Sequence, residues 1–503
     1  MSKSVRFRKT LLATLVCTAL GGSFAALPAH AQDADVARRI EALQKEIDAL
    51  KAQMQKVQAE QKAAPAATWG AAPTASPVSA AADAGYLTWS SADGNYVLKL
   101  DGRVQLDMGA VDSKLNSGVV QSDIKFRRVR LAFKGQFHKD WETELDLDFA
   151  NKELDIKDMW LAYRGIPGVG IKLGHFKPHF SLDQVTSSRV ATYLESSIAT
   201  EVFAPSRRIG LAAEYANDWL FIGGGVFGDK VNTVGEARDN PSLNAQAETF
   251  GYSMRAVGRP LWRGQENRAF HVGLNVLNNR PRSNAAPDDD RLKFAAVLEN
   301  ELSQIEFLDT KQIQNVDSAL TLGLETAFKY GPHILTAEYL QTKVKLGGVT
   351  ADMHPTLAAV WPTIAGPKVD SYYVAYSYFI RGDRRYDPSS AEFAGVVGKN
   401  ALEFTARYSM ADLNDTGGYT RNRTSSYRAT SLGLAGGKAK IATIGLNWYP
   451  NPNIKFVVNY LQADLDRNAD ADAGSFELAN AAVVPIVGGD KIKVLGVRAQ
   501  FAF

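Results

Sequence analysis

The chain has 503 residues, of which 45% are hydrophobic and 22% are charged, and its formal net charge is +3. Beyond the N-terminal region no stretch approaches the roughly 18 consecutive apolar residues that a membrane-spanning helix needs, and seven His with one Cys leave little for a metal site. A charge so close to zero gives no indication of a nucleic-acid partner.

The N-terminus has the pattern of a secretory signal peptide. Four basic residues precede an apolar run at 11–20, and the Ala29-His-Ala31 sequence is typical of a cleavage site. Cleavage after Ala31 removes Cys17, the single cysteine, and takes the formal net charge from +3 to −1. We therefore expect residues 1–31 to be removed on export, and the rest of the chain to fold outside the cytoplasm without disulfides.

A short periplasmic coiled-coil helix is predicted at 32–62. Its apolar residues recur at spacings of three and four, as in a heptad repeat: Ile40, Leu43, Ile47, Leu50, Met54 and Val57. About three heptads are marginal alone, so we expect this segment to associate only where the chains are already held together. A single amphipathic helix lying on a partner is the alternative. Residues 63–85, rich in Ala and Pro, are predicted to be a linker.

From residue 86 onward, polar and apolar residues alternate with a period of two. The last strand shows this best, because one face is apolar while the other is small or polar; the apolar face carries Leu495, Val497, Ala499, Phe501 and Phe503. Similar segments lie at 96–108, 128–134, 144–149 and 402–409. Strands with one apolar and one polar face, the last of them ending on a C-terminal aromatic residue, are typical of a transmembrane barrel.

Short and long links alternate between these strands. The short links, rich in Gly, Pro, Asn and Asp, lie at 137–141, 165–170, 215–219, 258–266, 330–333 and 449–453, and the long ones near 111–122, 178–205, 229–246, 280–315, 347–367, 412–436 and 465–488. A short link near 150–155 and a longer one at 381–399 break the alternation. About sixteen strands result, with short turns and both termini on the periplasmic side. We therefore predict an all-β fold, an antiparallel β-barrel of about sixteen strands over 86–503, in the bacterial outer membrane.

A barrel of this size is too wide for side chains to fill, so the inward residues control what passes. The alternation places basic residues on this wall, with acidic residues such as Asp146 and Asp148 facing Arg128 and Arg130; the basic set is Arg103, Arg128, Arg130, Lys172, Arg208, Arg255, Arg407 and Arg498. Opposed rows of charge would pull a polar solute along the wall. Simple pairing of the charges, which stiffens the wall, is the alternative.

The link at 178–205 is predicted to fold into the lumen and narrow the pore, because its apolar residues need a surface to pack on. Covering the external rim or a neighbouring subunit is the alternative. Its candidate solute-facing residues are Lys177, His179, Ser187, Ser188, Arg189 and Glu195, with Arg207 and Arg208 where the chain returns to the wall.

Several segments resemble the phosphate-selective porin O and P family: DGRVQLD (101–107), KFRRVRLAFKGQF (125–137), KLGHFKPHFSLDQVTSS (172–188), FAPSRRIGLAAEY (203–215), SYYVAYSYFIRGDRRY (371–386) and ALEFTARYS (401–409). The resemblance spans roughly 95–503. It implies a trimeric, sixteen-stranded porin that passes anions, with the third external loop folded inward and a long periplasmic turn at 381–399. It also implies that arginines, with lysines nearer the periplasm, guide phosphate or polyphosphate.

The resemblance carries anion-guiding positions onto the 127–130 arginine cluster and the Arg207/Arg208 pair. The family pattern requires a dense basic set on the inward loop, whereas 178–205 offers only Arg189, beside Glu195 and Glu201. This departure makes a weakly selective general porin the main alternative. The candidate anion-guiding residues are Arg103, Arg128, Arg130, Lys172, Lys177, Arg189, Arg207, Arg208, Arg255 and Arg407.

We expect a passive channel without catalysis, cofactor or metal. Its expected partners are small anionic solutes, outer-membrane lipid and lipopolysaccharide, and further copies of the chain as a homotrimer, with no nucleic acid. The sequence has neither G-x-S-x-G nor H-E-x-x-H. A non-conducting structural or adhesion barrel is another alternative. The acidic stretch at 466–477 has calcium-loop spacing but lacks the central glycine, and is expected to be a solvated loop or to meet lipopolysaccharide through divalent ions.

Overall fold

The computed structural model describes residues 79–83, 86–113, 122–150, 154–231, 248–261, 268–281, 292–302, 305–310, 315–349, 365–415, 434–466 and 489–503, with single residues or pairs at 45, 48, 51–52, 313, 359, 476–477 and 483–484. The chain divides into two compact units, Met1–Ala75 and Ser76–Phe503. In the first unit, the described residues Lys45, Asp48, Lys51 and Ala52 are helical and exposed. The predicted signal peptide and the rest of the predicted coiled coil lie outside the described residues.

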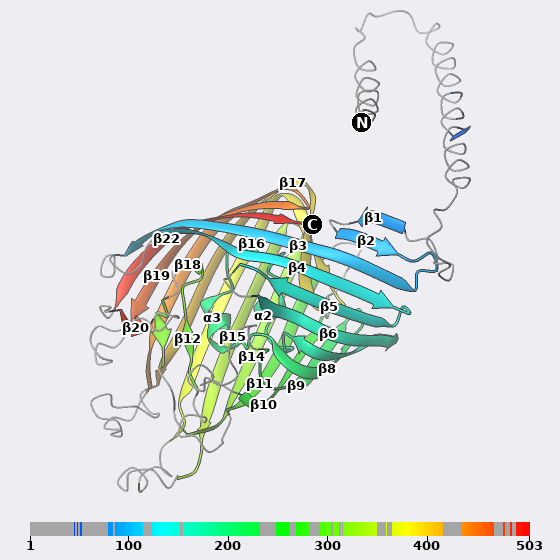
Figure 1. Cartoon of the computed structure of the whole chain (residues 1–503). Coiled ribbons are helices and arrows are strands. Elements are labelled where there is room, and N and C mark those ends of the chain that lie inside the picture. Colours follow the sequence, from blue (N-terminus) through cyan, green and yellow to red (C-terminus); the bar gives the residue numbers. More distant parts are fainter. Residues whose placement is uncertain are drawn as a thin grey trace, which may run out of the picture. The chain divides into compact units, whose positions relative to one another are not determined.

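Sixteen antiparallel strands close into a barrel in the described part of the second unit (Figure 1). They are β3 (Tyr96–Ser113), β4 (Asp123–Phe137), β5 (Trp141–Asp148), β6 (Asp155–Ile166), β7 (Val169–Phe176), β8 (Arg208–Ala216), β9 (Leu220–Phe227), β10 (Glu248–Gly258), β11 (Ala269–Pro281), β14 (Val316–Tyr330), β15 (His333–Leu346), β16 (Lys368–Asp387), β17 (Glu392–Asp415), β18 (Leu434–Asn451), β19 (Ile454–Asp466) and β22 (Asp490–Ala502). Each strand pairs with the next one in this order, and β22 pairs with β3. The predicted barrel class and strand number are confirmed.

The barrel closes at a seam beside the C-terminus. Phe503 and Gly102 exchange both backbone hydrogen bonds, at N–O distances of 2.8 and 2.9 Å. Beyond this point the same edge of β3 pairs with β2 (Tyr86–Ser90), which in turn pairs with β1 (Ser79–Asp83). Residues 79–83, at the end of the predicted 63–85 linker, form this outer strand, and residues 63–78 lie outside the described residues.

The strands alternate between an apolar outer face and a polar inner face. On β22, Leu495 and Phe501 are about half exposed on the outside, whereas Arg498 and Gln500 are buried inside the barrel. This is the arrangement that a sheet needs when lipid lies on one side and water on the other. It reproduces the predicted alternation of the last strand.

Two links pack inside the ring of strands. The link between β7 and β8 carries α2 (Leu182–Val185) and α3 (Ile198–Phe203), which Figure 1 shows within the barrel. The link between β11 and β14 contains the short pair β12 (Ala295–Ala296) and β13 (Leu308–Asp309). Buried residues of the two links, among them Ile198, Phe203, Phe294 and Leu302, form one apolar cluster with the wall. No helix in the described part of the chain is long and apolar enough to span a membrane.

The predicted long turn at 381–399 has a different structure. Strands β16 and β17 continue their pairing through it, with register shifts, to the pair Asp387 and Glu392. Only residues 388–391 form the turn. Its carbonyl groups at Ser390 and Ala391 accept hydrogen bonds from Arg255 on the inner wall, at 3.0 and 2.7 Å. The segment is thus a β-hairpin whose tip contacts the inner wall of the barrel. A remaining pair, β20 (Phe476–Glu477) and β21 (Val483–Val484), lies in the last long link.

Candidate functional site

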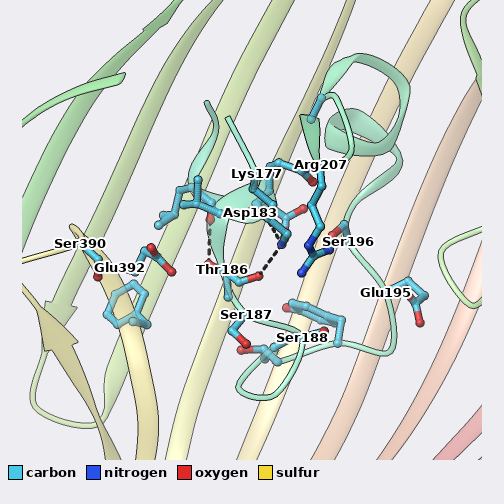
Figure 2. Close-up of a pocket in the computed structure, with 18 of the residues that line it drawn as sticks. Lys177, Asp183, Thr186, Ser187, Ser188, Glu195, Ser196, Arg207, Ser390 and Glu392 are labelled. Atoms are coloured by element: carbon cyan, nitrogen blue, oxygen red, sulfur yellow. Dashed lines mark hydrogen bonds between the residues drawn. The ribbon is translucent and has the colours of Figure 1, made fainter. Parts of the chain in front are cut away.

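The candidate site is a cavity of about 630 Å³ between the inner wall and the link of residues 177–207, which we call the inward loop. Figure 2 shows Lys177 and Arg207 directed toward one region of it, with Ser390 and Glu392 approaching from the 381–399 hairpin. Thirteen basic and eleven acidic residues line the cavity. Its charge is therefore close to balance, with a small basic excess.

The inward loop is fixed to the wall by hydrogen bonds from several strands. Glu338 on β15 accepts the backbone N–H groups of Leu182 and Asp183, at 3.2 and 2.8 Å. The Tyr193 hydroxyl donates to the carbonyl of Ala406 at 2.7 Å, and the Leu194 N–H donates to the Asn459 side chain at 3.1 Å. The predicted folding of 178–205 into the lumen is confirmed.

A β-bulge turns two consecutive arginines toward the lumen. Gln105 pairs with Arg128 and Leu106 with Phe126, so Arg127 has no partner in the β3–β4 ladder. A bulge disrupts the strict alternation of side chains, which allows Arg127 and Arg128 both to reach the inward loop. Strict period-two reasoning would have placed only one of them there.

Glu195 of the inward loop is the acceptor for this pair and for a third arginine. Arg128 and Arg498 donate to its carboxylate at 2.7 Å, and Arg127 donates at 3.0 Å. Burial of the carboxylate opposes ionisation, but the three arginines hold the pKa of Glu195 well below its usual value. Glu195 is therefore an ionised carboxylate held by three guanidinium groups.

The predicted opposed rows of charge are joined as ion pairs. Arg130 lies 2.8 Å from Asp148 and 3.4 Å from Asp146. At the end of the inward loop, Arg207 lies 2.6 Å from Asp158. For these residues the structure matches the alternative interpretation, in which wall charges neutralise each other.

Two more of the predicted arginines on the inner wall are also paired with carboxylates. Arg255 lies 2.9 Å from Glu325, and Arg407 lies 2.7 Å from Glu299 in the β11–β14 link. Arg407 also donates to the Glu195 carbonyl at 3.1 Å. These residues brace the inward loop and the hairpin against the wall.

Three basic residues of the cavity have no carboxylate partner among the described residues. The Nε atom of Arg103 is buried and makes no hydrogen bond there. Lys172 lies over the rings of Trp160 and Phe176, at 4.6 and 5.6 Å. Lys177, which follows β7, donates to the carbonyls of Gln184 and Thr186, at 2.6 and 3.3 Å. Burial, reinforced by neighbouring Arg207, lowers the pKa of Lys177 to about 7.

Eight of the ten predicted site residues line the cavity: Arg103, Arg128, Arg130, Lys172, Lys177, Arg207, Arg255 and Arg407. The other two do not. Arg189 is paired with Asp101 and donates to the terminal Phe503 carbonyl at 3.3 Å, and Arg208 donates to Ser206 and to the Arg207 carbonyl.

Some lining residues were missed by the sequence analysis. Lys157 and Arg164 of β6 line the cavity, but their strand has no clear alternation that would have indicated its inner face. Arg384 lines it from the hairpin, where it donates to the Val190 carbonyl at 2.6 Å. Among the described residues, no group of three or more His, Cys, Asp or Glu is placed to hold a metal ion. Most of the 466–477 stretch lies outside those residues.

Comparison with known proteins gives a consistent set of relatives. The family model for phosphate-selective porin O and P matches residues 98–503. A protein of Caulobacter vibrioides is 27% identical, covering 94% of this chain and 95% of its own length. Porin O of Pseudomonas aeruginosa is 24% identical, covering 78% and 89% respectively. Among solved structures, the anion-selective porin of Comamonas acidovorans aligns at 15% identity with a TM-score of 0.46, covering 81% of this chain and 100% of that one.

Proposed function

The chain belongs to the phosphate-selective porin O and P family, and we propose that phosphate or polyphosphate is among the solutes that it carries. It is a porin of the bacterial outer membrane, and its family indicates a channel rather than an enzyme. Porin O of Pseudomonas aeruginosa is one relative of this kind. The proposal concerns the identity of the anion and the residues that guide it.

The observation that carries the proposal is a set of three basic residues that have no carboxylate partner in the described part of the chain, Arg103, Lys172 and Lys177. They lie in a cavity where the other predicted arginines are neutralised. A basic group held by a carboxylate offers a passing anion little net charge, whereas a basic group without such a partner keeps more of its charge for that anion. We infer that anions move from one unpaired group to the next, and that the paired arginines hold the walls of the path. Phosphate suits such groups because its oxygens accept several hydrogen bonds at once.

Chloride current through the purified protein in a planar bilayer, measured with increasing inorganic phosphate, tests the identity of the anion. Phosphate that binds the unpaired groups should obstruct chloride and reduce its current at micromolar to millimolar concentrations, as an ion that stays longer at its site blocks a weaker one. Sulfate at equal ionic strength is the control for charge alone. A chloride current that phosphate leaves unchanged would remove phosphate as the favoured solute.

A weakly selective general porin is the second candidate. The near balance of thirteen basic and eleven acidic lining residues supports it, because mixed charges of both signs impose less ion selectivity than a ring of one sign. Liposome swelling distinguishes the two candidates. A weakly selective porin admits neutral sugars and organic anions of equal size at similar rates, whereas a phosphate porin favours the anions.

We further propose that the chain works as a homotrimer and that residues 32–62 contribute a periplasmic coiled coil to it, after removal of residues 1–31 as a signal peptide. The heptad spacing of the 32–62 segment supports this assembly. Chemical cross-linking in native membranes, with and without residues 32–62, tests it. We expect trimers in both cases, with the shortened chain dissociating at a lower temperature.

Contact with lipopolysaccharide phosphate is proposed for the outer rim of β15 and β16. Lys343 and Lys368 face each other across these strands, and both are exposed. Like charges at such a position are unfavourable, and a lipid phosphate between them would remove the repulsion. The paired Tyr339 and Tyr372 lie four residues nearer the membrane, where an aromatic girdle marks the lipid boundary. The Lys343→Gln/Lys368→Gln variant should retain less lipopolysaccharide on purification than Lys139→Gln, a variant at a periplasmic turn.

A further inference from the structure

The carboxylate of Glu195 is held in the way that a binding site holds a free anion. Five guanidinium N–H groups point at its two oxygens: two from Arg127 at 3.0 and 3.2 Å, two from Arg128 at 3.1 and 2.7 Å, and one from Arg498 at 2.7 Å. Arginine forks around one acceptor are the usual arrangement for carboxylate and phosphate recognition. Here the acceptor belongs to the chain itself.

The three arginines depend on this carboxylate to different degrees. Arg498 is also held by Asp107, through two contacts of 2.6 Å, and Arg127 lies 3.1 Å from Glu301. Arg128 has Gln105 as its other acceptor, at 2.9 Å, and no second carboxylate among the described residues. Loss of the Glu195 charge would therefore leave Arg128 as the uncompensated cation.

The backbone of the loop at Glu195 is held by contacts of its own, besides those of the side chain. The Leu194 N–H donates to Asn459 at 3.1 Å, and the Leu194 carbonyl accepts from Arg498 at 2.6 Å. The Glu195 carbonyl accepts from both terminal nitrogens of Arg407, each at 3.1 Å. The backbone is thus anchored on both sides of the residue, so its charge can be removed while the loop stays in place.

We propose that Glu195 is a tethered counter-ion that occupies an anion-binding site in the lumen and thereby sets the anion affinity of the channel. Both Glu195 and Arg128 line the cavity, so this site would be open to the permeating solutes if the carboxylate were removed. The proposed anion path is the basis of this inference. Glu195 acts as a specificity-determining residue, because a site already filled by a carboxylate holds a passing anion less tightly and releases it sooner.

The direct test compares the full chain with its Glu195→Gln variant in planar bilayers, under a potassium chloride gradient and with inorganic phosphate added. Glutamine keeps the shape of the side chain and removes its charge. The variant should shift the reversal potential toward chloride and lower the half-blocking phosphate concentration by about tenfold, the change expected from one added charge-assisted contact. Single-channel conductance should stay equal or fall.

Two further variants make the result specific. Glu195→Gln/Arg128→Gln should return both quantities toward the wild-type values, because Arg128 is the group set free. Asp317→Asn, which removes a charge from the ion pair with Lys345 on the outer face, should leave both unchanged and controls for net charge.

Each other outcome overturns the proposal. A larger conductance with reduced selectivity in Glu195→Gln would make Glu195 an anchor of the loop instead of a counter-ion. Unchanged phosphate block, or an increase that persists in the double variant, would remove the link to Arg128. The sign of the wild-type reversal potential tests the proposed function separately, since the inference concerns only the difference between variant and wild type.

Discussion

Arg103 on β3 lies directly opposite Arg130 on β4, and within the described part of the chain only Arg130 of these two has carboxylate partners. Like charges at facing positions repel each other, and the ion pairs of Arg130 with Asp146 and Asp148 reduce that repulsion. Arg130 is therefore neutralised, whereas the neighbouring Arg103 keeps its charge on the lumen side. This difference between two neighbours leads to the first prediction.

Arg103→Gln should reduce the preference for anions more than the removal of an arginine charge outside the cavity. A unit charge about 4 Å from an ion is worth about 1 kcal/mol in water, or about fivefold in the permeability ratio. Arg208→Gln is the matched control, because Arg208 does not line the cavity. The measurement is the reversal potential of each variant in a potassium chloride gradient. Equal shifts for the two variants would contradict the role assigned to Arg103.

The lowered pKa of Lys177 predicts that the anion selectivity of the channel depends on pH. Its pKa is lowered to about 7, so the side chain is charged below that pH and becomes neutral as the pH rises above it. The contribution of Lys177 to anion preference should be present at about pH 5.5 and lost by about pH 8.5.

Reversal potentials measured across this pH range, for the wild type and for Lys177→Arg, check the Lys177 prediction. The arginine variant stays charged throughout and should have a shallower profile than the wild type. The slope that remains belongs to other lining groups such as Glu201, whose pKa burial raises to about 7. Equal slopes in the two proteins, or a wild-type anion preference that rises with pH, would exclude Lys177 as a titrating group.

The hydrogen bonds of Glu338 predict that this residue holds the start of the inward loop in place. It accepts the N–H groups of Leu182 and Asp183 and the hydroxyl of Tyr373, the last at 2.8 Å. Glu338→Ala leaves these donors unsatisfied at a cost of about 1–3 kcal/mol each, so the start of the loop should loosen and the channel should widen. Single-channel conductance should rise and become noisier. Glu338→Gln keeps an acceptor oxygen and should stay closer to the wild type; equal conductance in all three proteins would show that the loop is held elsewhere.

The barrel could be predicted from sequence because its cause is local. Lipid outside and water inside force every strand to alternate, and a strand such as 490–502 shows this without knowledge of its neighbours. The alternation of short and long links also predicts that both chain ends lie on the periplasmic side. The inward loop was predictable for a similar reason, since Phe180 and Ile198 need an apolar surface in a segment otherwise made of loop.

The charge state of the site could not be predicted in the same way. Whether Arg130 meets Asp148 depends on the register of β4 and β5, and the inward direction of Arg127 depends on a bulge that one sequence does not reveal. Arg189 lies far along the inward loop, and its contact with Phe503 follows from tertiary packing. The predicted list therefore contains eight of the thirteen basic residues that line the cavity, but the sequence did not indicate which of them keep a free charge.

The contact at the seam between β3 and β22 predicts that substitutions at the C-terminus impair the assembly of the barrel. The ring of Phe503 lies over Gly102, where an added Cβ would come within 2.1 Å of the ring. Phe503→Ala and Gly102→Leu both disturb this contact, which contributes up to about 3 kcal/mol if the ring is fully covered. Both should lower the fraction of folded barrel in heat-modifiability gels of outer membranes. Gly258→Ala is the control, because its nearest neighbour lies at 3.9 Å; normal assembly of both seam variants would mean that closure does not depend on this contact.

The reversal potential of the wild-type protein in a planar bilayer with a potassium chloride gradient tests the central claim most directly. Arg103, Lys172 and Lys177 line the lumen without a carboxylate partner among the residues that the structure describes, so the barrel should give a potential of the sign set by chloride. A potential of the sign set by potassium, or a membrane-inserted protein without conductance, would contradict the account.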